Sequence, residues 1–92
     1  MKVYAKIKVL EVTEPQTFKI QKKDVPRSEV VAEIDDSVVA LSVWGKEKIN
    51  LANEALYSGV EKEVVLSITG KKIEKDDGTV LYMNNFTIKH WI

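Results

Sequence analysis

The stretch VVAEIDDSVVALSVWG, from Val30 to Gly45, decides the fold. It contains two runs of β-forming residues, Val30 to Ile34 and Val38 to Trp44, joined by Asp35-Asp36-Ser37. Asp and Ser favour tight turns because their side chains can hydrogen-bond to the nearby backbone. The stretch therefore predicts a β-hairpin whose second strand ends in a large aromatic residue.

The second strand of this hairpin has two different faces. One face carries Val39, Leu41 and Val43, and the other carries Ala40, Ser42 and Trp44. Successive side chains of a strand point to opposite sides, and the branched apolar set is the better core. We therefore expect Trp44 to face outward, over an accessible shelf formed by its small neighbours.

The chain before the hairpin predicts one strand and one long loop. Residues Lys2 to Val12 alternate between apolar and polar, as in a half-buried strand. The alternation changes phase after Val9, which predicts a bulge or a sharp bend. The segment from Thr17 to Ser28 is mostly polar and predicts a long loop, with or without a small flap of its own.

The chain after the hairpin changes period. Residues Lys46 to Tyr57 have apolar side chains at helical spacing, and Ser58-Gly59 is typical of a helix end. The remainder predicts a strand from Val64 to Ile73, an Asp-Gly turn within Lys75 to Thr79, and a last strand from Val80 to Trp91 that is interrupted at Asn84-Asn85.

This order of elements predicts an all-β fold. The sequence predicts five strands, with one short helix between the third and the fourth. This is the order of elements in a Greek-key OB-fold barrel. A chain of 92 residues has room for one core, so we expect a single domain over residues 1–92.

Composition excludes several classes of function. The chain has no cysteine, which rules out disulfides and thiolate metal sites. It has one histidine, no glycine-rich phosphate loop and no catalytic constellation, so we expect neither an enzyme nor a metal or cofactor. No continuous apolar run resembles a secretion signal or a membrane span, which predicts a soluble, cytoplasmic protein without membrane contact.

Charge is balanced overall but unevenly distributed. Fourteen basic and fourteen acidic residues give a net charge of zero. The segment from Lys19 to Arg27 nevertheless holds four cations and one acid, and further lysines follow Trp44 and occupy positions 71, 72 and 75. Segregated charge permits phosphate binding, and a neutral total predicts that such binding is modest and salt-sensitive.

Three segments resemble the single-stranded DNA-binding OB-folds of archaeal SSB and replication protein A. They are VLEVTEPQT from Val9 to Thr17, the hairpin from Val30 to Gly45, and YMNNFT from Tyr82 to Thr87. The resemblance covers nearly the whole chain. It rests on the order and the spacing of the three segments. It implies an SSB-like protein of DNA replication or repair that binds single strands largely without regard to sequence.

The resemblance places Trp44 where an aromatic ring stacks on a base, and it places the loops Thr17 to Ser28 and Lys75 to Thr79 beside the groove. A flat ring beside fixed cations also suits an unpaired base on physical grounds. We expect the nucleic-acid contacts to be Phe18, Lys22, Lys23, Arg27, Ser42, Trp44, Lys46, Lys71 and Lys75. The family usually has a second stacking aromatic on the fourth strand or the loop after it, and KKIEK from Lys71 to Lys75 has none. Phe18 and Tyr82 are the candidates for a second ring.

Two other functions stay open from the sequence. An OB-fold subunit that assembles replication or repair proteins would suit the neutral charge, the missing second aromatic and the apolar residues Phe86, Ile88, Trp91 and Ile92. An RNA-binding OB module would differ in its recognition of the 2′-hydroxyl group. Single-stranded DNA is favoured as the partner, and self-association or a protein partner is expected because one small domain makes few contacts.

Overall fold

Six strands and one helix make up the fold, and the computed structural model describes all 92 residues. The elements are β1 (Lys2–Val12), β2 (Gln16–Ile20), β3 (Lys23–Ile34), β4 (Ser37–Trp44), α1 (Lys46–Ser58), β5 (Lys62–Glu74) and β6 (Val80–Trp91). The helix α1 lacks the length and the apolar character needed to cross a membrane.

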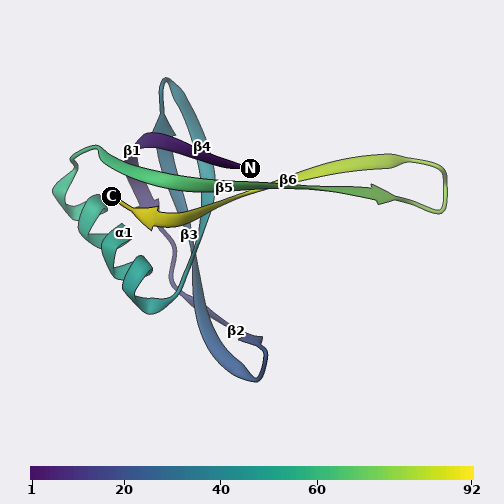
Figure 1. Ribbon diagram of the computed structural model, residues 1–92, viewed down its shortest axis with the longest axis horizontal. Coiled ribbons are helices and arrows are strands. Elements are labelled where there is room, and N and C mark those ends of the chain that lie inside the picture. Colours follow the sequence, from purple (N-terminus) through teal and green to yellow (C-terminus); the bar gives the residue numbers. More distant parts are fainter.

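Five of the strands close into a barrel (Figure 1). The strand order is β1-β5-β6-β4-β3, and β3 pairs again with β1 to complete the ring. All the pairings are antiparallel except that of β4 with β6, which rests on one parallel pair, Ser42 with Thr87. The short strand β2 lies outside the ring and pairs only with β3. The expected OB-type barrel is therefore present.

Strand β1 closes the barrel by pairing with two different strands. Its first half, Lys2 to Ile7, pairs with β5, and its second half, Lys8 to Val12, pairs with β3. The register of the second pairing shifts between Val9 and Glu11. The bulge predicted from the change of phase is confirmed, and it lets one strand turn from one neighbour to the other.

The core is formed by the inward-facing residues of the barrel strands and by one face of α1. On β4, Leu41 and Val43 are buried, as the alternation predicted. The helix contributes Ile49, Ala52 and Ala55. The remaining buried members of the core cluster are Ile7, Val9, Val30, Ala32, Val64, Leu66 and Ile88.

The predicted position of the helix in the strand order is wrong. It lies between the fourth and fifth strands, because the expected loop contains the additional strand β2 and the start of β3. All five residues of β2 are exposed. A strand that covers no core needs no alternation of apolar residues, which is why its sequence resembles a loop. Gln21 and Lys22, with φ of 50° and 67°, form the tight turn between β2 and β3.

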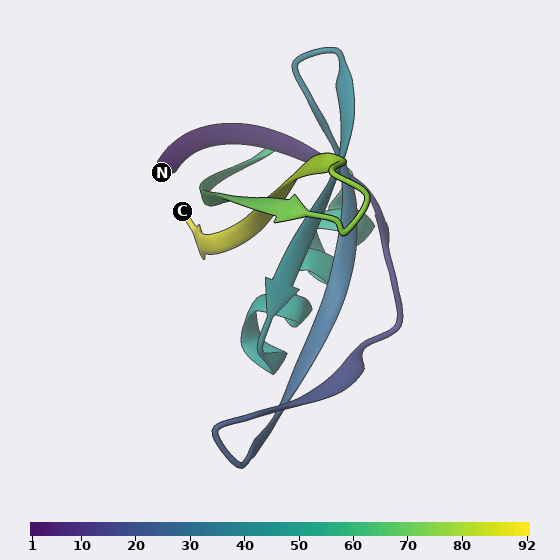
Figure 2. The ribbon, with the colours of Figure 1, turned by 90° about the vertical axis from the view of Figure 1, so that its right-hand side faces the viewer.

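The predicted interruption of the last strand is also wrong. Backbone pairing continues through Asn84, opposite Gly70, and Asn85, opposite Thr69. Beyond this point β5 and β6 run on as a two-stranded hairpin, residues 70–84, which we call the β5–β6 arm. Figures 1 and 2 show the arm projecting from the barrel in a different direction from the β2–β3 hairpin. The longest dimension of the molecule is 47 Å.

We predict that Gly59→Ala destabilises the fold by about 1–2 kcal/mol, the cost of a left-handed conformation for a residue with a Cβ. Gly59 ends α1 with φ of 67°, and its N–H donates to the Ala55 carbonyl. An added Cβ would meet no atom within 4 Å, so the penalty comes from the backbone alone. Urea unfolding measures the change, with Asn53→Ala in the middle of α1 as the control. An unchanged midpoint for Gly59→Ala would contradict this account of the helix end.

Candidate nucleic-acid interface

Two aromatic rings from different strands meet on the outside of the barrel. The centroids of Phe18, on β2, and Trp44, the last residue of β4, lie 5.5 Å apart, with the ring planes inclined at 60°. Phe18 is 39% exposed and Trp44 is half-buried, so solvent reaches both rings in part. Of the two candidates for a second ring, Phe18 is therefore the one that lies beside Trp44.

Arg27 on β3 lies between these two strands and covers part of the site. The carbon Cζ of its guanidinium is 5.7 Å from the centroid of the Trp44 ring, within the range of a cation–π contact. Its Nη2 donates a hydrogen bond of 2.6 Å to Oγ of Ser42. Of the two small residues expected to form an open shelf beside Trp44, Ser42 is buried, at 5% exposed, and Ala40 is exposed. We call Phe18, Arg27, Ser42 and Trp44 the aromatic–arginine cluster.

The register of three strands brings this cluster together. Arg27 is paired with Gln16 of β2 on one side and with Trp44 on the other. Paired residues share a face of the sheet, and so do residues two positions apart, which aligns Phe18 and Ser42 with them. At the start of the next element, the Gly45 N–H donates to the Pro26 carbonyl over 2.9 Å and fixes the end of β4 against β3.

The charge of Arg27 has no acidic partner. The one ion pair in the chain joins Lys72 and Glu74 over 3.2 Å. A guanidinium carries five N–H donors, and Arg27 uses one of them within the chain. A half-buried cation with four free donors is well suited to an anion such as a phosphate group.

The expected lysines are spread around the cluster rather than gathered in it. Lys23 is paired with Ile20, which puts it on the face of Phe18 near the β2–β3 tip, and Lys22 occupies the turn itself. Lys46 begins α1 two residues after Trp44. All three lysines are exposed. They can therefore reach a bound strand only along the edges of the site.

The two remaining lysines lie on the β5–β6 arm. Lys71 and Lys72 point to opposite sides, since Lys71 is paired with Met83 and Lys72 with Tyr82. Lys75 lies at the tip of the arm, where its N–H donates to the Thr79 carbonyl. Tyr82 is 74% exposed on the arm and makes no contact with the aromatic–arginine cluster, so it does not serve as the second ring there.

A hydrogen-bonded carboxylate, that of Asp77, lies at this tip. Hydrogen bonding with the side chain and the backbone of Thr79 lowers the pKa of Asp77. The backbone bond, from the Thr79 N–H to Oδ1 of Asp77, measures 2.9 Å. Asp77 therefore stabilises the turn. Lys75, at the same tip, forms no ion pair.

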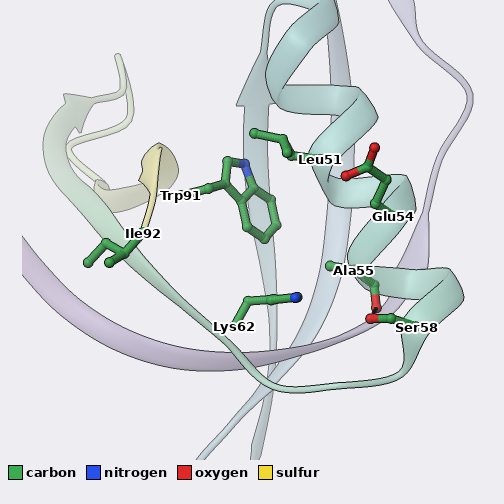
Figure 3. A pocket seen from close by; sticks show the side chains of 7 residues that line it. All are labelled: Leu51, Glu54, Ala55, Ser58, Lys62, Trp91 and Ile92. Carbon is green, nitrogen blue, oxygen red and sulfur yellow. Dashed lines mark hydrogen bonds between the residues drawn. The ribbon is translucent and has the colours of Figure 1, made fainter.

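A separate hollow of about 250 Å³ lies between α1 and the end of β6 (Figure 3). Trp91 forms one wall, and Glu54 and Lys62 contribute opposite charges. Trp91 packs against the core, and its buried Nε1 has no hydrogen-bond partner. None of the predicted nucleic-acid contacts lines this hollow.

Comparison with known proteins identifies the fold. The crystal structure of the mitochondrial single-stranded DNA-binding protein Rim1 from S. cerevisiae matches with a TM-score of 0.60 and 13% sequence identity, over 100% of this chain and 92% of that chain. No protein-family model and no curated protein matches the sequence. The chain thus has the same fold as this protein, and the OB-type barrel that the resemblance implied is confirmed.

We predict that the bond between Arg27 and Ser42 contributes about 1–2 kcal/mol to stability, toward the lower end for a bond to a charged group because Arg27 is partly exposed. Ser42→Ala should lower the free energy of unfolding by this amount in the natural sequence and by almost nothing in an Arg27→Met background. Urea unfolding of the four proteins measures the coupling. Equal losses in both backgrounds would show that Ser42 does not hold the guanidinium.

Proposed function

We propose that this chain binds single-stranded nucleic acid, DNA in preference to RNA, largely without regard to sequence. The observation that carries the proposal is the half-buried guanidinium of Arg27, unpaired with any acid, beside the partly exposed rings of Phe18 and Trp44. An aromatic platform recognises bases, and an adjacent cation recognises the backbone phosphate. The similar fold of Rim1 supports the proposal without fixing any contact.

A base has to take the place of Arg27 to stack on Trp44. The guanidinium lies over this ring and is held by one hydrogen bond to Ser42. On binding, the base covers the indole and the guanidinium turns to the phosphate of the same nucleotide. Phe18, whose plane is inclined at 60° to that of Trp44, offers a second face to a neighbouring base.

Electrostatics limits the affinity of this site. Glu29 is paired with Ser42 in the register of β3 and β4, so its carboxylate lies on the same face as Arg27. Lys22, Lys23 and Lys46 are exposed around the site and Lys71 is exposed on the β5–β6 arm, and all four can contribute to the attraction at a distance. The neutral total charge then gives modest, salt-dependent binding, and self-association or coating of the strand by several copies compensates.

We propose a binding role rather than a catalytic one. The cluster contains no nucleophile with an adjacent base, and the described chain has no group of three acids or histidines that would hold a metal ion. The alternative function, assembly of other proteins, would leave the chain indifferent to oligonucleotides.

Trp44→Ala should weaken binding to a single strand by about 1–3 kcal/mol, the contribution of one stacked base, while the fold persists. Titrating the chain with poly-dT, poly-U and duplex DNA at two salt concentrations measures this loss and the preference for DNA. Trp91→Phe is the matched control, because it leaves Trp44 as the only tryptophan and lies outside the site. Fluorescence of Trp44 that does not respond to poly-dT would rule out the proposal.

Glu29→Gln should strengthen binding to poly-dT about two- to five-fold, since it removes a partly screened repulsion of about 0.5–1 kcal/mol between carboxylate and phosphate. The gain should shrink as salt is added. Glu61→Gln, in the connection between α1 and β5, is the control for a change of net charge alone. An equal gain for both variants would show that Glu29 has no special place beside the bound strand.

A further inference from the structure

One side of α1 faces the hollow of about 250 Å³ and is only partly covered (Figure 3). This side consists of Leu51, Glu54, Ala55 and Ser58, at the spacing that aligns side chains along one face of a helix. Ala55 belongs to the buried core, whereas Leu51 is 41% exposed. The apolar stripe of α1 is therefore wider than the part that the barrel covers.

The opposite wall of the hollow adds more apolar surface. Trp91, the last residue of β6, is half-buried there, and Ile92 beside it is 66% exposed. Lys62, the first residue of β5, completes this wall. An apolar surface that is open to water and edged by charged residues is typical of a contact with another protein.

The two charged residues of the hollow have no partner within the chain. Glu54 lies on the α1 wall and Lys62 on the β5 wall, whereas the one ion pair joins Lys72 and Glu74 on the β5–β6 arm. None of the side-chain hydrogen bonds involves Glu54 or Lys62. One unpaired carboxylate and one unpaired ammonium group thus flank the same apolar surface.

This distribution of charge is complementary to itself. In a two-fold symmetric interface the same surface is used by both copies, so each contact from one copy to the other is repeated in reverse. Glu54 of one copy can then pair with Lys62 of the other, and the reverse pair forms at the same time. The net charge of zero leaves no overall repulsion between two copies. The surface therefore suits a second copy of this chain.

We propose that this side of α1, together with the adjoining ends of β5 and β6, is a two-fold interface between two copies of the chain. Leu51 of each copy packs into the hollow of the other, and two Glu54–Lys62 pairs form across the interface. The inference goes beyond the proposed function. No member of the aromatic–arginine cluster lines the hollow, so the dimer keeps both clusters open and offers two of them to one strand.

Sedimentation equilibrium of the full chain without nucleic acid measures the dissociation constant of the dimer. Leu51→Gln should raise this constant about ten- to hundred-fold, because each dimer loses two apolar side chains from its interface. Leu81→Gln is the matched control, since Leu81 is also 41% exposed but lies on the β5–β6 arm. It should leave the constant unchanged, and circular dichroism checks that both variants keep the fold.

Reversal of charge tests the pairs directly. Glu54→Lys and Lys62→Glu should each raise the dissociation constant about five- to twenty-fold, because each puts two pairs of like charges across the interface. The double variant Glu54→Lys/Lys62→Glu restores both pairs in the opposite sense and should recover the dimer. Glu14→Lys, an exposed position between β1 and β2, is the control for the change of net charge.

The outcomes separate the interface from the proposed function. A chain that is monomeric at every concentration, or equal constants for Leu51→Gln and Leu81→Gln, would overturn the interface. Failure of the double reversal to recover the dimer would do the same. A chain that dimerises as described but binds no oligonucleotide would overturn the proposed function and uphold the interface.

Discussion

The structure depends on the pairing of β3 along its whole length. This strand pairs with β2 through its first residues, with β1 through its last, and with β4 from Arg27 to Ile34. Its alternation divides the side chains between two environments: Val30 and Ala32 fill the barrel, while Arg27 faces outward and is half-buried. A shift of one residue would exchange the two sets, so the burial of the core also fixes the position of the guanidinium.

The surroundings of Arg27 account for a cation that has no counterion. Partial burial raises the cost of an isolated charge, and the Ser42 hydroxyl and the face of Trp44 each offset part of it. Neither group neutralises the charge. Under the proposed function, a nucleotide suits this site because its base can replace the guanidinium on the indole while its phosphate binds the guanidinium.

The sequence predicted those elements that bury a face. The hairpin ending at Trp44, the bulge after Val9 and the helix ending at Gly59 all follow from an alternation or a period that the core imposes. The strand β2 has no buried residue, so nothing in its composition separates it from a loop. For the same reason the sequence did not place Phe18: its contact with Trp44 depends on a register across β3 that is set by the tight Gln21-Lys22 turn.

The β5–β6 arm differs from the barrel, because its strands pair without covering a core. A two-stranded hairpin is marginally stable by itself in water. The arm nevertheless exposes Leu81, Tyr82 and Met83, by 41%, 74% and 58%. Its order then depends on the barrel at its root, where Ile68 and Phe86 are paired and half-buried.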